Sequence, residues 1–244
     1  MMTDTAWLSR TELLLGKEKL NKLMNAHVLV VGMGGVGSFA AEFICRAGVG
    51  EMTIIDGDVV DPSNRNRQLP ALATTHGQSK AVLMGERLKQ INPELKLTVI
   101  REFVMPDRVD SMLAGNPDYV VDAIDSITPK MTFMSAAYIK GMRIVSSMGA
   151  GARLDPTQIK IADISKTFNC PFAQQLRKQL KGYGIKTGIK AVFSPEEPRK
   201  ESLMLTDGSN FKKSAYGTIS YLPATFGAVV ASVVIREIIG EKVI

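Results

Sequence analysis

The sequence predicts an α/β protein built on a doubly wound, largely parallel β-sheet. Short apolar runs alternate with segments of helical spacing through the first 150 residues, which is typical of parallel strands joined by helices. The first apolar run leads directly into a cluster of glycines, as in strand-to-helix turns that face a ligand. Of the 244 residues 45% are apolar, which is enough to bury a sizeable core.

The predicted elements follow a regular order along the chain. An amphipathic helix over 7–25, interrupted at Gly16, precedes the first strand. We then expect strands at 27–34, 51–58, 96–103, 118–125 and 142–149, and helices at 35–47, 77–93 and 129–141, with a short helix between the third and fourth strands. After residue 150 the pattern weakens to a strand at 159–164, a helix at 170–181, a basic loop at 182–213 and an apolar helix at 221–240. We therefore divide a single domain, 1–244, into an N-terminal helical arm (1–26), a core (27–150) and a C-terminal part (151–244).

Positive charge is concentrated in one part of the chain. The net charge is +6, and residues 170–213 hold nine Lys or Arg against four Asp or Glu. A basic, loop-rich segment of this kind attracts polyanions, although a solvated loop with surplus lysines is an equally simple interpretation.

The apolar C-terminal run predicts a buried helix rather than a membrane span. It is broken by Pro223 and carries Arg236 and Glu237. The N-terminus lacks the charged-then-apolar pattern of a signal peptide. Two distant cysteines provide neither a disulfide framework nor a zinc pair. These observations favour a cytoplasmic protein without stable membrane insertion.

The glycine cluster predicts a nucleotide site of the Rossmann type. The stretch "VVGMGGVGS" fits G-x-G-x-x-G through Gly32, Gly34 and Gly37, which permit a tight turn and close approach of the backbone to phosphate. Asp56 ends the second strand, about 20 residues on, where a carboxylate accepts hydrogen bonds from ribose hydroxyls. A dehydrogenase that binds a dinucleotide is the ordinary inference from these residues alone.

The loop after Asp56 favours a triphosphate instead. Asn64, Arg65, Asn66 and Arg67 follow closely, and Lys80 begins the next helix. Preplaced donors of this kind suit phosphoryl groups and the charge that develops during their transfer. The alternative is a surface turn whose arginines form salt bridges, and it is more plausible for Arg65 than for Arg67.

Two aspartates in "VVDAIDS" lie where a strand ends. Asp125 is nearer the strand tip than Asp122, and a triphosphate requires Mg²⁺, which takes one or two carboxylates and keeps several waters. We expect Asp125 to be the metal ligand, whereas Asp122 fits a buried structural carboxylate equally well.

Five motifs together resemble the adenylating domain of the ubiquitin-activating-enzyme superfamily: "RTELLLG", "VLVVGMGGVGS", "IIDGDVVDPSNRNRQ", "GQSK" and "DAIDS". The resemblance implies a homodimer completed by the C-terminal part, and a core that binds ATP and Mg²⁺. It implies four catalytic residues, namely Arg10, Arg67, Lys80 and Asp125, with Arg10 reaching into the partner protomer's site and Asp125 on the metal. The implied ATP-binding residues are Gly32, Gly34, Gly35, Gly37, Asp56, Asp58, Ser63, Asn64, Arg67, Lys80, Asp125 and Ser126.

The C-terminal half distinguishes between members of this superfamily. Activators of sulfur carriers typically have two Cys-x-x-Cys zinc pairs, whereas Cys45 lies on an apolar helix and Cys170 stands alone. Residues 149–180 and the basic segment resemble the tRNA threonylcarbamoyladenosine dehydratases, although those enzymes usually have Asp where Cys170 precedes Pro171. The resemblance implies ATP-dependent cyclisation of the modified adenosine beside the anticodon, through an acyl-adenylate.

Several alternatives remain open from the sequence. One is an adenylyltransferase acting on a ubiquitin-like sulfur carrier, one is an NAD(P)-linked oxidoreductase, and one is a non-catalytic nucleotide sensor. A sulfurtransferase partner is also left open. If tRNA is the substrate, we expect the basic stretch 177–213 to contact its phosphates, and the cations selected for a test are Lys186, Lys190, Lys212 and Lys213.

Overall fold

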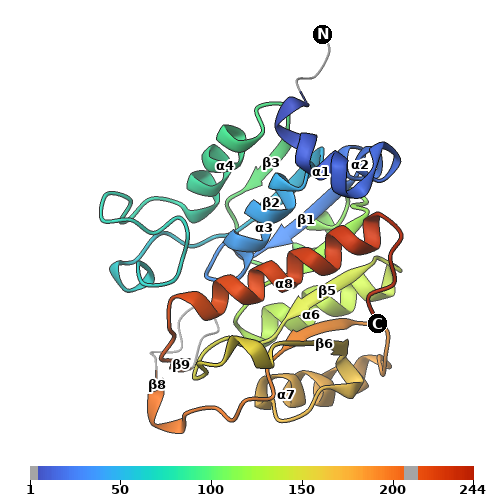
Figure 1. Ribbon diagram of the computed structural model, residues 1–244. Helices are drawn as coiled ribbons and strands as arrows, with labels where there is room; N and C mark the ends of the chain where they lie inside the picture. Colours follow the sequence, from blue (N-terminus) through green and yellow to red (C-terminus); the bar gives the residue numbers. More distant parts are fainter. Residues whose placement is uncertain (1–4, 206–213) are drawn as a thin grey trace.

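The computed structural model describes residues 5–205 and 214–244. Seven strands form one sheet in the order β3-β2-β1-β4-β5-β7-β6 (Figure 1). Every neighbouring pair is parallel except β6 and β7, which are antiparallel. The doubly wound, largely parallel sheet is therefore confirmed. Its strands are β1 (His27–Val31), β2 (Glu51–Ile55), β3 (Lys96–Ile100), β4 (Tyr119–Asp122), β5 (Ile144–Ser147), β6 (Lys160–Asp163) and β7 (Lys190–Phe193).

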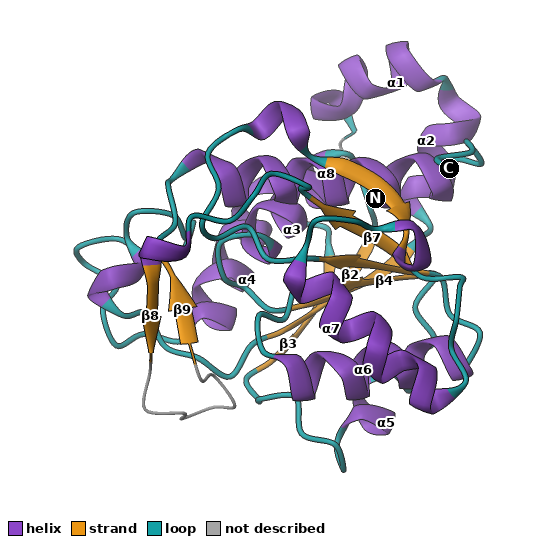
Figure 2. Ribbon diagram, turned by 90° about the horizontal axis from the view of Figure 1, so that it is seen from below, coloured by secondary structure: helices purple, strands orange, loops and turns teal. Residues whose placement is uncertain are grey.

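Helices cover both faces of the sheet (Figure 2). One face carries α3 (Gly37–Arg46), α4 (Lys80–Ile91) and α8 (Tyr221–Ile238), whose apolar residues join one core cluster. The other face carries α5 (Val109–Met112), α6 (Ile127–Ile139) and α7 (Pro171–Leu180), which join a second cluster. Single 3-10 turns at η1 (Ala6–Leu8), η2 (Pro62–Asn64), η3 (Pro156–Gln158), η4 (Ile164–Lys166), η5 (Lys181–Tyr183) and η6 (Lys200–Ser202) shape the connections.

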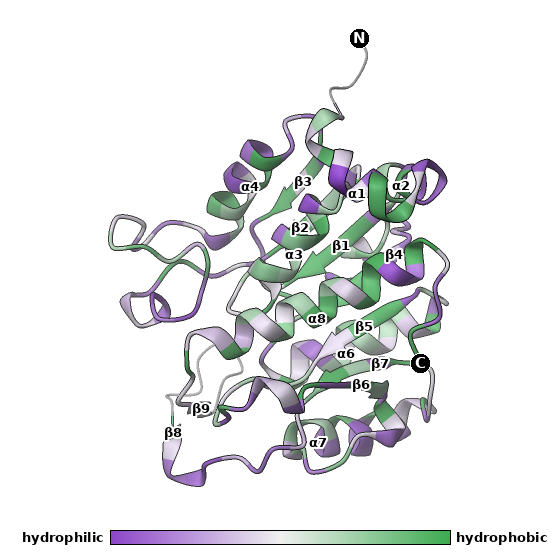
Figure 3. Cartoon of the chain, in the orientation of Figure 1, coloured by the Kyte–Doolittle hydropathy of each residue, from purple (hydrophilic) through white to green (hydrophobic). Residues whose placement is uncertain are grey.

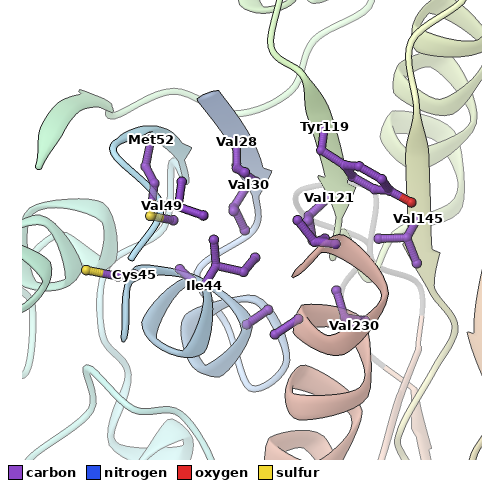
Figure 4. Packing of buried hydrophobic residues seen from close by; sticks show 14 of the residues in the cluster. Val28, Val30, Ile44, Cys45, Val49, Met52, Tyr119, Val121, Val145 and Val230 are labelled. Atoms are coloured by element: carbon purple, nitrogen blue, oxygen red, sulfur yellow. The ribbon is translucent and has the colours of Figure 1, made fainter. Parts of the chain in front are cut away.

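The strands are apolar on both faces because both are covered, as parallel sheets require. In β1 the side chains alternate: Val28 and Val30 point into the α3 side (Figure 4). Leu29 and Val31 belong to the cluster on the α6 side. Apolar residues accordingly fill the centre of the molecule, and hydrophilic ones gather in loops and on outer helix faces (Figure 3). Cys45 belongs to this core, where burial raises the pKa of its thiol to about 12, so its interpretation as a core residue is confirmed.

The N-terminal arm consists of two helices, α1 (Ser9–Leu15) and α2 (Lys17–Met24), which separate at Gly16 as predicted. Gly16 has φ +80°, a conformation that L side chains rarely adopt. The arm packs against the loop that precedes β2: a Cβ on Gly48 would lie 3.0 Å from the side chain of Leu8. It therefore lies at the amino end of β2 (Figure 1).

The expectation of a continuous basic loop over 182–213 was wrong. Residues 190–193 form β7, which is buried between β5 and β6, and Leu203–Leu205 (β8) pairs with Ser214–Tyr216 (β9) in a separate two-stranded sheet. The segment "KAVF" becomes a strand because β5 and β6 pair with it on both sides. Residues 206–213 of the predicted loop lie outside the described residues.

The C-terminal helix α8 is buried against α3, as its apolar composition predicts. It is the one helix of the described ranges long and apolar enough to cross a membrane, and half of it is buried within this fold. Its apolar residues serve the core on the α3 side of the sheet.

Candidate nucleotide-binding site

The glycine turn joins β1 to α3 at the carboxyl edge of the sheet. Gly32 has φ +91°, and a Cβ there would lie 2.7 Å from the carbonyl oxygen of Ala123. A Cβ on Gly37 would lie 1.7 Å from the carbonyl oxygen of Gly32, so both positions require glycine for packing. At Gly34 a Cβ would meet only the amide of Gln68, at 3.8 Å, so the backbone there is open to an approaching phosphate.

Helix α8 supports this turn, which the sequence did not reveal. A Cβ on Gly35 would lie 3.0 Å from Pro223, and a Cβ on Gly227 would lie 2.6 Å from the carbonyl oxygen of Val36. The glycine turn is thus held between the sheet and the first half of α8. The Gly-Pro spacing within an otherwise apolar helix is the only local signal of this contact.

Asp56 follows β2 and binds the glycine turn. Its Oδ2 accepts a hydrogen bond from the backbone N–H of Met33 at 2.6 Å, and its Oδ1 accepts one from Asp58 at 2.7 Å. Burial raises the pKa of the Asp56 carboxyl above its ordinary value, although the Lys80 cation and both N–H donors favour its charged form. The carboxylate that was expected to hold ribose therefore also fixes the ends of β1 and β2 relative to each other.

Lys80 begins α4 and is almost fully buried beside two carboxylates. Its Nζ lies 3.1 Å from Oδ2 of Asp58, while the charge of Asp56 also acts on it. Asp58 is half-exposed, so the ion pair borders solvent. The structure thus gathers one cation and two carboxylates at the end of β2.

The polar loop after β2 is ordered by its own side chains. Asp61 accepts hydrogen bonds from the backbone and hydroxyl of Ser63, and Asn64 returns one by accepting from the N–H of Asp61 at 3.2 Å, which completes a capping box. Arg67 donates to the carbonyl oxygen of Ser63 at 3.0 Å and to Oδ1 of Asn66 at 2.9 Å. Asn64 is buried and Arg65 is exposed, so the loop presents Arg67 rather than Arg65 toward the site.

Arg67 and Asp125 connect the two halves of the site. Burial lowers the pKa of the Arg67 guanidinium, and the charge of Asp125 opposes that shift, so the two side chains lie within electrostatic reach. Asp125 is exposed on the loop after β4. A single accessible carboxylate fits Mg²⁺ held mainly by phosphates and water. Accordingly, the described residues contain no group of three or more His, Cys, Asp or Glu that could hold a metal on its own.

Asp122 is the buried structural carboxylate of the two. Its Oδ2 lies 2.7 Å from Nζ of Lys130 and accepts a hydrogen bond from Ser146 at 2.7 Å; neither Asp122 nor Lys130 has an exposed side chain. Lys130 also donates to the carbonyl oxygen of Ile124 at 3.0 Å. This network fixes the loop that carries Asp125, and its sequence signal is a lysine on the buried face of α6.

Most of the predicted site residues meet at this edge of the sheet, and Arg10 does not. Arg10 is exposed on α1, near the amino end of β2, whereas Asp56 follows the carboxyl end of that strand, about 17 Å away. The residues brought to the site are Gly32, Gly34, Gly35, Gly37, Asp56, Asp58, Ser63, Asn64, Arg67, Lys80, Asp125 and Ser126.

Gln68 is a residue that sequence reasoning missed. Its amide lies beside Gly34, and its Oε1 is buried without a hydrogen-bond partner within the described part of the chain. A buried orphan acceptor next to the open stretch of backbone marks the place where a ligand donor or a water belongs. The only sequence signal was its position after Arg67.

The structure revises the cations selected for phosphate contact. Nζ of Lys190 lies 2.9 Å from Oε1 of Glu237, and both side chains are largely buried, so this lysine joins β7 to α8. Lys186 is exposed, as expected. Lys212 and Lys213 lie outside the described residues.

Comparison with known proteins agrees with this geometry. Residues 8–244 match the ThiF family. The tRNA threonylcarbamoyladenosine dehydratase of Escherichia coli (strain K12) is 38% identical over 99% of this chain and 97% of its own length. The crystal structure of the E. coli enzyme in complex with ATP superposes with a TM-score of 0.89, at 37% identity, over 98% of this chain and 96% of that chain. A molybdopterin-synthase adenylyltransferase of Salmonella typhimurium is 33% identical over 54% of this chain and 52% of its own length. The chain therefore belongs to the ThiF family and, within it, to the tRNA threonylcarbamoyladenosine dehydratases, which are ATP-dependent adenylating enzymes.

Proposed function

We propose that this protein activates the threonylcarbamoyl carboxylate on a tRNA adenosine with ATP and closes it into a ring with loss of water. The observation that carries this proposal is the site itself: an open glycine turn, a ribose-side carboxylate and two phosphate-side cations, Arg67 and Lys80. This constellation lies within a chain that matches a dehydratase over almost its whole length.

The carboxylate has to be activated because oxide or hydroxide, which it would otherwise expel, is a poor leaving group. One carboxylate oxygen attacks the α-phosphorus of ATP, and pyrophosphate leaves, which produces an acyl-adenylate. The carbamoyl group of the same modification then attacks the activated carbonyl, loses a proton and expels AMP. No protein nucleophile is required, and Cys45 and Cys170 are both buried.

Each site residue has a role in this scheme. The backbone at Gly34 and the α3 N-terminus receive the phosphates, and Asp56 accepts from ribose hydroxyls. Arg67 and Lys80 stabilise the charge on the departing pyrophosphate. Asp125 would hold Mg²⁺, which neutralises and orients the phosphates when it is bound.

The active form in this proposal is a homodimer in the cytoplasm, with tRNA as substrate. Arg10, remote from its own site, then enters the partner's site. The exposed Leu13 and Leu14 on the same helix supply apolar surface for such an interface. Docking of a sulfurtransferase would be an additional interaction that this chemistry does not require.

Mass spectrometry of tRNA nucleosides tests the proposal. Incubation of threonylcarbamoyl-modified tRNA with protein, ATP and Mg²⁺ should convert the modified nucleoside into a product lighter by one water, with one AMP per product. A pyrophosphate-exchange assay with a ubiquitin-like carrier protein tests the main alternative. Exchange with the carrier and an unchanged nucleoside would overturn the proposal, as would tighter binding of NAD⁺ than of ATP in calorimetry.

A further inference from the structure

One stretch of the chain holds six cations and no acid. Between residues 164 and 195 the sequence has no Asp or Glu. The six cations give this stretch a charge of +6, which equals the net charge of the whole protein. The cations of this acid-free segment are Lys166, Arg177, Lys178, Lys181, Lys186 and Lys190.

The acid-free segment encloses a groove of about 560 Å³ along α7. Ala173, Leu176 and Leu180 face the core, so the helical phase turns Lys178 and Lys181 outward. They line the groove together with Gln174, Gln175 and Arg177, and with Lys186 from the following loop. In the view from below, α7 lies at the surface of the molecule (Figure 2).

Three of the lining cations carry uncompensated charge. Lys178, Lys181 and Lys186 are exposed, and none forms an ion pair with a carboxylate of the described ranges 5–205 and 214–244. Of the other three cations of the segment, Arg177 donates to the hydroxyl of Thr167, Lys190 pairs with Glu237, and Lys166 does not line the groove. Basic residues at a helix C-terminus stabilise the helix only modestly, which leaves the clustering at the groove unexplained.

We propose that this groove binds the sugar-phosphate backbone of the tRNA whose modified adenosine occupies the nucleotide-binding site. The inference rests on the proposed function. A concave row of unpaired cations suits a string of phosphates better than a flat lipid surface. Tyr183, half-exposed between Lys181 and Lys186, offers a ring on which an unpaired base can stack.

The first turn of α7 lies near the catalytic edge of the sheet, whereas the basic end of the groove lies toward the opposite, amino edge, where β7 begins: Ile164 and Lys186 line the groove, and the backbone N–H of Ile164 donates to the carbonyl oxygen of Ile189, next to β7. The ring of Phe172, in the first turn of α7, lies 5.8 Å from Nζ of Lys130, which binds the loop of Asp125. Ten residues of helix carry the chain about 15 Å from that point to the end of α7. A stem-loop with its reactive base in the site therefore has to extend at least about 15 Å beyond the first turn of α7 to contact these lysines.

Two charge-matched variants test the groove. One is Lys178→Gln/Lys181→Gln/Lys186→Gln, and the control is Lys22→Gln/Lys96→Gln/Lys242→Gln, which removes three exposed lysines that do not line it. Binding of threonylcarbamoyl-modified tRNA is measured against salt concentration, together with ATP affinity, thermal unfolding and kcat/KM for dehydration. The groove variant should bind tRNA at least about tenfold more weakly at 0.1 M salt, with a log–log salt slope shallower by about 2.

Each outcome bears on the proposal separately from the function. The control should retain tRNA affinity, and both variants should retain ATP affinity and unfolding temperature. Equal weakening in both variants would overturn the groove and leave only a general charge effect. If the wild type dehydrates tRNA and the groove variant binds tRNA as tightly as the wild type, the groove proposal is overturned and the proposed function stands. If the wild type neither binds nor dehydrates tRNA, both proposals are overturned. Loss of binding to phosphatidylglycerol vesicles with unchanged tRNA binding would reassign the groove to a membrane surface.

Discussion

Two lysines on α6 and at its end show how burial changes the role of one side chain. Lys130 and Asp122 are fully buried 2.7 Å apart, whereas Lys140 pairs with Asp110 at 2.9 Å on the surface. Burial lowers the pKa of Lys130, and the charge of Asp122 opposes that shift. The buried pair ties the start of α6 to the end of β4, which determines where the Asp125 loop lies.

Replacing these lysines by methionine should have very different costs. Lys130→Met leaves Asp122 as a buried carboxylate without its cation, and the free energy of unfolding should fall by about 3–5 kcal/mol. Lys140→Met removes an exposed pair and should cost less than about 1 kcal/mol. Urea unfolding monitored by circular dichroism measures both. Similar losses in the two variants would show that the buried pair is dispensable.

Asp125→Asn should abolish most turnover while the fold persists. Asp125 is exposed, and the change removes one charge with little change in volume. We therefore expect the free energy of unfolding to stay within about 0.5 kcal/mol of the wild-type value. The rate of dehydration should fall at least about 10²-fold, as when a preplaced electrostatic contact is lost. Asp110→Asn, at a surface aspartate on α5, is the matched control. Retained activity with normal Mg²⁺ dependence would remove Asp125 from the proposed metal site.

At the scale of elements, local pattern predicts most of the sheet but not β7, the strand that lies between β5 and β6. The strands from β1 to β5 and the helices between them were predictable because each apolar run is long enough to show a period. The segment 190–193 is short, begins with Lys190 and follows a glycine-rich stretch, so nothing local marks it as a strand. Its conformation comes from pairing with β5, more than forty residues earlier.

The candidate site likewise contains residues that the sequence predicts and contacts that only the tertiary structure shows. Asp56, Arg67, Lys80 and Asp125 were predictable because they stand in contiguous motifs. The Lys130 network, the orphan acceptor of Gln68 and the support from α8 depend on tertiary contacts, and the local signals that accompany them do not identify the partner residues.

The crossing of α8 over the glycine turn gives an element-scale prediction. Gly227→Ala places a methyl group 2.6 Å from the carbonyl oxygen of Val36, so α8 or the turn must shift. We expect a loss of stability of about 1–3 kcal/mol, as for overpacked cores, together with weaker ATP binding. Gly182→Ala, whose Cβ would meet nothing within 4 Å, is the control. Urea unfolding measures the loss of stability, and calorimetry measures ATP binding. An unchanged ATP affinity in Gly227→Ala would show that the packing of α8 does not affect the nucleotide-binding site.

At the scale of the whole molecule, the proposed homodimer accounts for the distance of Arg10 from its own site. Co-expression of Arg10→Ala and Lys80→Ala chains tests this arrangement, because each change alone should nearly abolish turnover. About half of the dimers should be mixed, and each mixed dimer has one site with its own Lys80 and the partner's Arg10. About a quarter of all sites should therefore regain activity. Purified mixed dimers as inactive as the parents would exclude action across the interface.

The strand order also has a consequence for synthesis on the ribosome. β6 (Lys160–Asp163) is made before β7 (Lys190–Phe193) but lies outside it at the sheet edge, so β6 has no partner until residue 193 has emerged. The support for the glycine turn comes later still, with Pro223 and Gly227 of α8. A nascent chain therefore carries an unpaired strand until β7 has been made and an uncovered apolar face on α3 until α8 has been made. Nucleotide binding that depends on this support can begin only after α8 has been synthesised, and products that stop before α8 expose the surfaces that chaperones and proteases recognise.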